Sequence, residues 1–464
     1  MHIRKYDFNY GRRQLMKNAA MGAGAGVLMP LSKLFAAEQS IAKAYPDELM
    51  SIEMYTKGKI KPGDFITAQN VEVVKDLLDP IVYDQIKTMN RKIKIRATET
   101  DLTKMFPHEY YEATMRNLRD GVSGKFNAEG NVVTQDGKNW VGGMPFPDPK
   151  TGDEVQANMA MSWGRGDYNQ YAVNDTVFNP DGSKGYSYDL VWAELQVQGR
   201  CDGKVFRDMD DLVRLQTVLF TATQDVAGSS FLSTWYYDQR KFPDLYGYLP
   251  QFRRVRQFPT NQRFEPLIPG VTWFLSDAWA AGDPMRTWGE YKILDRKPML
   301  GAFNSNWGGA DSDNWVHNVH GGPKGETFFD VEYELAPEVV IVESKPTGYP
   351  RSPVGRRLAY CDVRNSLFCG SIRFDRQDKP WVNFEAGFGQ YKAGDKEVKG
   401  PDGKHTAWSW TYVMSFDAQT RRMSRIAHQK ECTGGYQSVF RQGEDEKMYS
   451  RFFTQQALQR LGQV

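Results

Sequence analysis

The chain has 464 residues and a formal net charge of +2, from 59 lysines and arginines against 57 aspartates and glutamates. A charge so close to zero gives no long-range field that could hold a polyanion, which argues against a nucleic-acid partner. Hydrophobic residues make up 40% and aromatic residues 13%, enough for a large core, which excludes general disorder. Beyond the N-terminus no stretch approaches the ~20 apolar residues of a membrane-spanning helix, so we expect no integral membrane span.

The N-terminal segment 1–37 has the features of an export signal. Arg12 and Arg13 open a basic region, the weakly apolar run 18–31 follows, and small residues end the segment. The paired arginines resemble the twin-arginine type of signal. An amphipathic first helix is the alternative, although the glycines of the run would make it a poor helix. The first cysteine is Cys201, so none is placed for lipid attachment, and we expect a soluble periplasmic protein.

Twin-arginine export often accompanies a cofactor, but the chain carries no familiar cofactor motif. It lacks a C-x-x-C pair, a C-x-x-C-H haem attachment site and an H-E-x-x-H zinc motif. The sequence therefore predicts no cofactor.

The four cysteines lie too far apart in sequence for a cluster-binding motif and favour disulfides in an oxidising compartment. Four cysteines allow three connectivities. Cys361 and Cys369 flank a turn near Asn365 and could pair across a hairpin. Cys201 would then pair with Cys432.

Two patterns divide the chain after the signal. Residues 38–120 are polar, and apolar residues at positions 71, 74, 77 and 78 follow helical spacing, so we expect a helical segment that packs on a sheet. Residues 121–464 alternate short segments rich in Tyr, Trp, Phe, Val and Thr with Asp-Gly and other glycine turns. This pattern predicts a mainly β domain (α+β overall) with antiparallel strands.

The clearest strands form a meander near the C-terminus, with segments that begin at Glu338, Arg356, Phe368, Trp381, Thr406 and Met423. One parity of the segment 407–416 is strongly aromatic, with Trp408, Trp410, Tyr412 and Met414. That face either packs as ordinary core or lines an apolar pocket of a curved sheet. The sequence leaves both interpretations open.

A glycine-rich loop holds the best metal candidate, formed by Asp311, Asp313, His317 and His320. Two histidines and two carboxylates suit zinc or another divalent ion. A His-x-x-His pair converges only on a helix or tight turn, however. The flanking glycines favour the alternative of a loop whose side chains are solvated or cap turns.

Two further sets of residues are candidates for ligand binding. Alternation places Arg254 and Arg256 on one face of a strand, where they could bind an acidic head group or a partner's carboxylates. Alternatively, they protect an exposed sheet edge against aggregation. Trp273 and Trp288 could line a binding mouth, with core packing as the alternative.

Several short stretches resemble the bacterial domain of unknown function 1329 family: GMPFP at 143–147, YLP at 248–250 with RRVR at 253–256, EYE at 332–334, GRR at 355–357 and YCD at 360–362. The resemblance covers roughly residues 50–460. It implies a fold similar to the LolA-type lipoprotein-sorting proteins of the outer membrane, in which a curved antiparallel sheet forms an incomplete barrel and helices close an apolar cavity. It also implies association with resistance-nodulation-division transporters and an outer-membrane protein, and it defines no catalytic residues.

Residues and resemblance together predict a periplasmic carrier or chaperone for a hydrophobic, lipid- or terpenoid-like molecule that serves a transporter. An enzyme acting on a hydrophobic substrate is one alternative, suggested by the export signal and the loop 311–320, although the sequence leans against an enzyme. An adaptor that binds another protein in a transport complex is the second. The candidate binding residues are Trp273, Trp288, Trp408, Trp410, Tyr412, Arg254 and Arg256.

Overall fold

The computed structural model describes residues 45–161, 165–259, 263–277, 283–440 and 443–463. The predicted export signal, residues 1–37, lies outside these ranges. Within the described ranges, no helix is long and apolar enough to cross a membrane.

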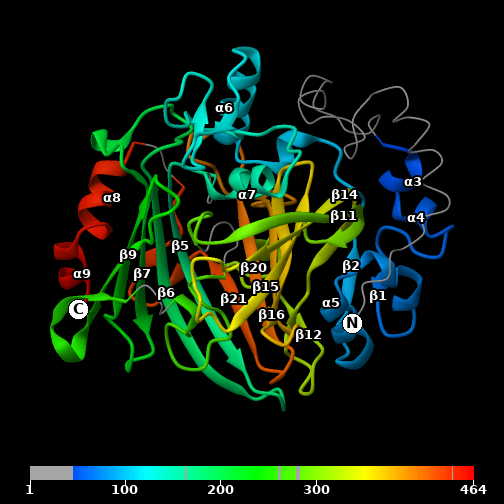
Figure 1. Cartoon of the computed structure of the whole chain (residues 1–464). Coiled ribbons are helices and arrows are strands. Elements are labelled where there is room, and N and C mark those ends of the chain that lie inside the picture. Colours follow the sequence, from blue (N-terminus) through cyan, green and yellow to red (C-terminus); the bar gives the residue numbers. More distant parts are fainter. Residues whose placement is uncertain (1–44, 162–164, 260–262, 278–282, 441–442, 464) are drawn as a thin grey trace.

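One open sheet of fifteen strands dominates the protein (Figure 1). Its order is β1-β2-β14-β15-β16-β17-β20-β21-β5-β6-β7-β8-β9-β10, and β11 also pairs with β14. Neighbouring strands are antiparallel except β2 and β14. The long strands are β5 (Tyr168–Phe178), β6 (Lys184–Gln196), β7 (Leu212–Ala222), β8 (Ser230–Tyr236), β9 (Asp244–Leu249), β10 (Arg254–Phe258), β11 (Gly289–Gly301), β14 (Glu332–Lys345), β15 (Val354–Asp362), β16 (Leu367–Asp375), β17 (Pro380–Gln390), β20 (Trp408–Asp417) and β21 (Met423–Gln429), with the short β1 (Phe65–Ile66) and β2 (Ile93–Ile95) at one end.

The predicted mainly β fold with an antiparallel meander is confirmed, and so is the incomplete barrel, because the sheet does not close. Its two halves are joined by one ladder between β21 and β5, from the pair Met423 and Phe178 to the pair Gln429 and Ala172. Strands β10 and β11 lie at opposite edges of the sheet although they are consecutive in the chain.

The remaining elements are short. The helices are α3 (Asp47–Met50), α4 (Ile52–Tyr55), α5 (Pro80–Thr88), α6 (His108–Arg119), α7 (Gly152–Ala160), α8 (Asp445–Phe452) and α9 (Gln455–Leu461), with 3-10 turns η1 (Val71–Leu77), η2 (Leu102–Met105), η3 (Phe206–Asp208), η4 (Pro250–Phe252) and η6 (Gly308–Ala310). Small hairpins pair β3 (Gly124–Phe126) with β4 (Val132–Thr134), β12 (Val319–His320) with β13 (Phe328–Phe329), β18 (Lys392–Ala393) with β19 (Lys396–Glu397) and β22 (Glu431–Cys432) with β23 (Tyr436–Gln437).

The helical spacing seen from position 71 produces the 3-10 turn η1, whose Val71, Val74 and Leu77 are buried. A new helix, α5, then begins at Pro80. Proline suits the first helical position because its missing N–H would have no partner there. Asp79 caps this helix, so the segment forms two short helical pieces, η1 and α5.

The two sides of the sheet carry different hydrophobic clusters. One cluster takes side chains from both halves of the sheet, including Tyr171 of β5, Val218 of β7, Val340 of β14, Phe384 of β17 and Trp410 of β20. We call this side the inner face. A single cluster that spans both halves is what the concave side of a curved sheet produces.

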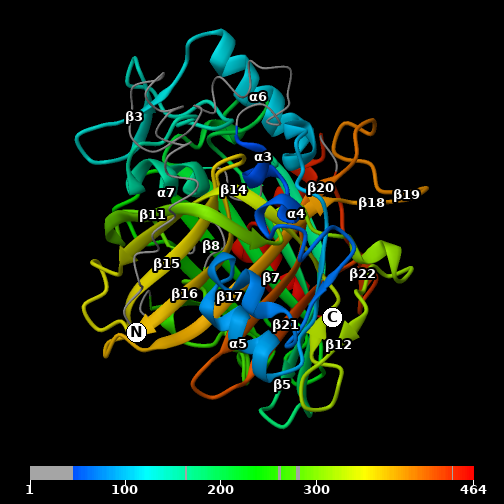
Figure 2. The ribbon, with the colours of Figure 1, turned by 90° about the vertical axis from the view of Figure 1, so that its right-hand side faces the viewer.

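The opposite, outer face carries two separate clusters. In Figure 1, α8 and α9 lie on the left flank of the molecule, and α3 to α5 lie on the right. Residues of α4, η1 and α5 pack on strands β14 to β20, and Figure 2 shows these helices in front of the sheet. Residues of α8 and α9 pack on β6 to β9.

The inner face is covered by α7 and by a segment without regular structure. We call this segment the plug, and its described residues are 263–277 and 283–288. It connects the two edge strands β10 and β11. Ile268, Val271, Trp273 and Met285 of the plug belong to the inner cluster.

A β-bulge in β20 changes the predicted aromatic face. Trp410 pairs with Phe388 and Tyr412 pairs with the preceding Gly387, so Thr411 is an extra residue in β20. Trp408 and Trp410 therefore lie on the inner face, whereas Tyr412 and Met414 lie on the outer face. Strict alternation, on which the sequence argument depended, fails at a bulge.

Candidate binding sites on the two faces of the sheet

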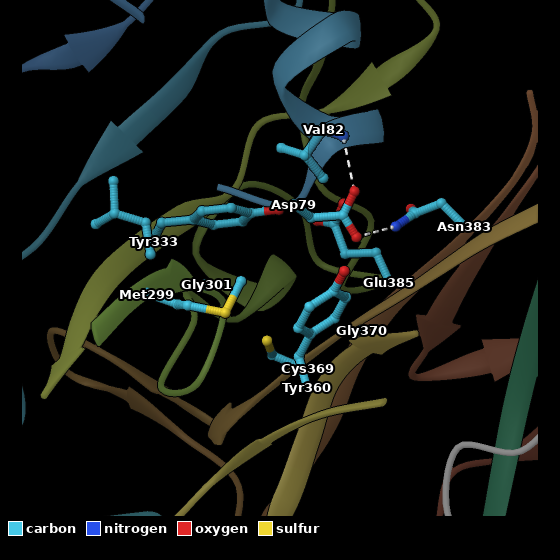
Figure 3. Close-up of a pocket in the computed structure, with 11 residues that line it drawn as sticks. Asp79, Val82, Met299, Gly301, Tyr333, Tyr360, Cys369, Gly370, Asn383 and Glu385 are labelled. Atoms are coloured by element: carbon cyan, nitrogen blue, oxygen red, sulfur yellow. Dashed lines mark hydrogen bonds between the residues drawn. The ribbon is translucent and has the colours of Figure 1, made fainter. Parts of the chain in front are cut away.

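A small cavity lies on the outer face between α5 and the sheet (Figure 3). Its volume is about 20 Å³, whereas one water molecule needs roughly 10–15 Å³. The cavity is therefore too small for an acyl chain. Its lining residues are Asp79, Val82, Met299, Leu300, Gly301, Tyr333, Tyr360, Cys369, Gly370, Asn383 and Glu385.

Asp79 joins α5 to the sheet at this cavity. Its Oδ1 accepts hydrogen bonds from the backbone N–H groups of Ile81, at 2.7 Å, and Val82, at 3.2 Å. Its Oδ2 accepts one from Asn383 Nδ2 at 2.9 Å. Burial raises the pKa of Asp79 to about 6, and the charge of Glu385 adds to this effect. The carboxyl is thus a helix cap held against a strand.

Glu385 and Arg91 form a buried ion pair beside the cavity. Arg91 Nη1 donates to Glu385 Oε2 at 2.8 Å and Arg91 Nη2 donates to Oε1 at 2.7 Å. Tyr412 donates its hydroxyl to Oε1 at 2.7 Å, and Gln85 Oε1 accepts from Arg91 Nη1 at 2.7 Å. Burial alone would raise the pKa of Glu385, but Arg91 and the hydrogen bonds lower it overall. This bidentate pair is a structural anchor.

Cys369 contributes a thiol to the same cavity. Burial raises its pKa well above the ordinary value, with nearby acidic groups adding to the effect. A thiol in this environment stays protonated and is a poor nucleophile. Cys369 is therefore not an activated nucleophile.

On the inner face, the plug is held by buried polar contacts. Trp273 Nε1 donates to Asp175 Oδ2 at 2.7 Å. Thr272 Oγ1 donates to the carbonyl oxygen of Ser415 at 2.6 Å. Thr272 and Ser424 also exchange two hydrogen bonds, each between one backbone N–H and the other hydroxyl, at 3.1 and 3.2 Å. These contacts tie one point of the plug to strands β5, β20 and β21.

Charged groups hold the plug at a second point. Arg373 of β16 lies 3.0 Å from Asp277 Oδ2 and donates to the carbonyl oxygen of Thr272 at 3.1 Å. Within the plug, Asp283 pairs with Arg263 and accepts from Trp288 Nε1 at 2.8 Å. The plug therefore combines aromatic packing with buried polar contacts.

Two carboxyl groups of the inner face have raised pKa values. Burial raises the pKa of Asp175 to about 7, and hydrogen bonds from Trp273 and Ser424 offset only part of this effect. Burial also raises the pKa of Glu194 to about 7, although Trp192 and Arg214 act in the opposite direction. The ionisation of both groups changes near neutral pH.

The structure places the predicted tryptophans in the core. Trp410 stacks on His428 with ring centroids 4.5 Å apart, and Trp408 stacks on Phe388 at 5.7 Å. Trp273, Trp408 and Trp410 share the inner cluster, while Trp288 belongs to a separate cluster at the plug. Tyr412 contacts Glu385 on the outer face, so the bulge separates it from the other four predicted aromatic residues.

Arg254 and Arg256 are exposed on the edge strand β10, which pairs only with β9 among the described strands. The guanidinium of Arg256 lies 4.4 Å from the ring centre of Phe252. This position agrees with the alternative interpretation, in which the two arginines protect a sheet edge.

The predicted metal residues do not come together. Asp311 and Asp313 are exposed, and Asp311 accepts a hydrogen bond from Asn318. His317 is buried, its ring centre is 5.8 Å from that of Tyr412, and burial lowers its pKa to about 4. Burial also lowers the pKa of His320 to about 4. Within the described ranges, the group of three potential metal ligands lies elsewhere, at His108, Asp402 and His405.

The predicted disulfides are wrong, because all four cysteines are free and buried. Cys361 pairs across β15 and β16 with Phe368, one position before Cys369. The two cysteines therefore point to opposite faces of the sheet, Cys361 inward and Cys369 outward. Cys201 and Cys432 belong to different hydrophobic clusters and are not paired either.

Comparison with protein families gives a match to the family described as protein of unknown function DUF1329, over residues 65–459. The chain belongs to this family. A search of curated proteins gives no match. The resemblance inferred from the short sequence stretches is thereby confirmed for most of the chain.

Solved structures similar to this DUF1329 member include three bacterial proteins. A putative outer membrane lipoprotein-sorting protein domain from Vibrio parahaemolyticus has 13% identity and a TM-score of 0.43, covering 67% of this chain and 98% of that one. A DUF1329 family protein from Desulfovibrio piger has 13% identity and a TM-score of 0.39, covering 60% and 89%. A LolA superfamily protein from Nitrosomonas europaea has 12% identity and a TM-score of 0.37, covering 66% and 99%.

Two features escaped the sequence argument. The sequence did not predict the plug, because its position depends on β10 and β11 lying at opposite edges of the sheet. The local sequence pattern does not reveal the order of the strands. The second feature is the group of His108, Asp402 and His405. The two histidines lie far apart in the chain, and the sequence indicated only a turn at Asp402-Gly403. Neither histidine has the spacing of a known metal motif.

Proposed function

We propose that the protein carries a hydrophobic, lipid- or terpenoid-like molecule in the periplasm and binds it on the inner face of the sheet. One observation carries this proposal. The aromatic inner face is covered by the plug, an irregular connection between the two sheet edges, and not by a further layer of sheet. Because the described residues of the plug pair with no strand, the plug can leave without breaking the sheet.

Binding requires the plug to move. The cavities of about 20 Å³ and 10 Å³ are far smaller than the roughly 300–1,000 Å³ of a typical ligand site. The side chains of Ile268, Val271 and Trp273 occupy the space that a guest would need. A guest that buries the same apolar area would regain about 25 cal/mol per Å².

The inner face also offers polar groups to a guest. The indole N–H groups of Trp307 and Trp408 are buried and make no hydrogen bond to the protein. A buried donor without an acceptor is costly. A guest with an ester, carboxyl or hydroxyl oxygen beside its apolar body would supply that acceptor.

A reversible cross-link tests this proposal. Thr272 of the plug and Ser424 of β21 exchange two hydrogen bonds, so we expect the double variant Thr272→Cys/Ser424→Cys to form a disulfide between the plug and this strand. Under oxidising conditions the disulfide should abolish uptake of a fluorescent fatty acid, and a reductant should restore it. The single variant Thr272→Cys is the matched control and should bind as the unmodified protein does.

Uptake by the locked protein equal to that of the control would refute binding under the plug. Native mass spectrometry of protein exported from its own host addresses the natural guest. A discrete adduct that organic extraction releases would identify the class of cargo.

A protein-binding adaptor is the second candidate, favoured by the small size of the two cavities. In that case the disulfide between the plug and β21 would leave binding of the partner protein unchanged, and a membrane partner would copurify without lipid. Affinity purification from membranes would also test the implied link to a resistance-nodulation-division transporter and its outer-membrane protein.

A further inference from the structure

Three side chains that could ligate a metal meet at one end of α6. His108 is the first residue of that helix, and Asp402 and His405 lie in the loop before β20. One potential ligand atom from each residue lies within 4.8 Å of the other two. No other group of three His, Cys, Asp or Glu side chains in the described ranges meets this condition.

The loop fixes the carboxylate of Asp402. Its Oδ1 accepts hydrogen bonds from the backbone N–H groups of Lys404, at 2.8 Å, and His405, at 2.9 Å. Its Oδ2 lies 2.6 Å from His405 Nδ1. A carboxylate that holds the proton of one ring nitrogen leaves the other nitrogen with its lone pair available to a metal. Asp402 can therefore orient His405 or bind the ion directly.

The rings of His108 and His405 lie face to face, with centroids 3.5 Å apart and planes inclined by 16°. In a tetrahedral zinc site with Zn–N distances of about 2.0–2.1 Å, two histidine rings splay to roughly 5 Å between centroids. The side chain of His405 is 51% exposed, so this ring has room to rotate outward. Binding would thus open a stack that already brings both imidazoles together.

A cavity adjoins the group and leaves space for a further ligand. His108 and His405 line it together with Glu109, Arg165, Trp408 and Phe440 among others. Glu109 Oε1 is buried, and the Glu109 carboxyl interacts with the backbone N–H of Asp402. An oxygen of this kind beside two imidazoles suits a fourth ligand or a partner for a metal-bound water.

We propose that His108, Asp402 and His405 bind a divalent transition-metal ion, zinc above all, with the open coordination position facing this cavity. Two nitrogen ligands and one carboxylate favour zinc, nickel or copper over magnesium or calcium, which prefer sets of oxygen ligands. The ion would tie α6 to the loop before β20, next to Trp408 at the margin of the inner face. This proposal does not depend on the carrier function.

Calorimetric titration of the full-length exported protein with zinc chloride tests the site, using an affinity tag without histidine. We expect one ion per chain, with at least tenfold weaker binding in His108→Ala and in His405→Gln. His320→Ala is the matched control, because that histidine belongs to the loop 311–320, and it should leave binding unchanged.

Two outcomes would overturn the proposal. One is that the unmodified protein binds no zinc, and the other is that His108→Ala and His405→Gln both bind zinc as tightly as the unmodified protein does. Loss of binding only in His320→Ala would instead assign the ion to the loop 311–320. A thermal unfolding scan in EDTA checks that each variant folds. A second scan has zinc in place of EDTA. Zinc should raise the unfolding temperature of the unmodified protein and not that of His405→Gln.

Discussion

The two covers of strands β14 to β21 differ in how they hold their buried charges. On the outer face, α5 is a capped helix, and Glu385 receives a bidentate ion pair from Arg91 that lowers its pKa. On the inner face, the plug is irregular. Asp175 accepts a hydrogen bond from the neutral indole N–H of Trp273, and burial raises the pKa of Asp175 to about 7.

This difference shows two ways to close a face of a sheet. The outer cover stabilises a charge permanently, because removing either partner would strand the other in the core. The inner cover combines neutral contacts with the ion pair of Arg373 and Asp277, and Asp175 has a pKa near neutral pH. Since α5 is a capped helix and the plug is irregular, we infer that the outer cover is a fixed part of the fold and that the plug is the part that a guest can displace.

The largest effect should follow from Arg91→Ala. This change leaves Glu385 charged and buried without its partner, which should lower the free energy of unfolding by about 3–5 kcal/mol. Urea denaturation measures this change. The double variant Arg91→Met/Glu385→Leu removes both charges and should recover most of the loss. A stability of Arg91→Ala within about 1 kcal/mol of the unmodified protein would contradict a permanent outer anchor.

A smaller effect should appear as a pH dependence of the inner face. The pKa of Asp175 is raised in the folded state, so its contribution to stability is full below the ordinary aspartate pKa and is lost as pH rises through about 7. Between pH 7.5 and pH 5.5, the unmodified protein should therefore gain on the order of 2 kcal/mol relative to Asp175→Asn.

Asp79→Asn is the matched control on the outer face. The pKa of Asp79 is about 6. Between pH 7.5 and pH 5.5 the unmodified protein should therefore gain roughly 1 kcal/mol of stability or less relative to Asp79→Asn. The buried histidines titrate alike in all three proteins, so they cancel in the comparison. Urea denaturation at each pH gives the free energy of unfolding. If that free energy changes equally with pH in the unmodified protein and in Asp175→Asn, the raised pKa of Asp175 is refuted.

Helix caps on the two faces offer a finer comparison. Thr151 and Glu154 form a capping box on α7, which covers the inner face, and Thr454 caps α9 on the outer face. Replacing either threonine with alanine should cost about 1 kcal/mol. Only Thr151→Ala should also speed the uptake of a fluorescent fatty acid, measured by stopped-flow. Faster uptake in Thr454→Ala would remove the distinction between the faces.

The smallest effect on stability should come from the exposed edge strand. Arg254→Ser/Arg256→Ser changes two exposed side chains of β10, so the urea midpoint should stay unchanged. Aggregation measured by light scattering should increase, because charged residues on an edge strand oppose pairing between molecules. Loss of fatty-acid binding without aggregation would instead restore these arginines as ligand contacts.

The strands were predictable because their signal is local. Segments expected from Glu338 to Met423 became β14, β15, β16, β17, β20 and β21 in the expected antiparallel order. Alternating apolar residues and glycine turns report a strand wherever it lies in the fold. The bulge at Thr411 was not predictable, since one unpaired residue leaves no mark in the sequence pattern.

The candidate sites were less predictable because they depend on distant residues. The predicted disulfide between Cys361 and Cys369 is wrong because Cys361 pairs with Phe368, and a β-bulge leaves Cys369 unpaired on the opposite face of the sheet. Trp273 and Trp408 were recognised as candidates, but their common position on the inner face depends on the order of the strands in the sheet. His108 and His405 meet through tertiary structure alone.

The ladder between β21 and β5 has a consequence for folding kinetics. It pairs residues 423–429 with residues 172–178, so the two halves of the sheet can join only after nearly the whole chain has left the ribosome. Contacts between such distant segments are slow to form. We expect a late, rate-limiting closure, during which the exposed edges of the half-sheets would be a natural substrate for chaperones.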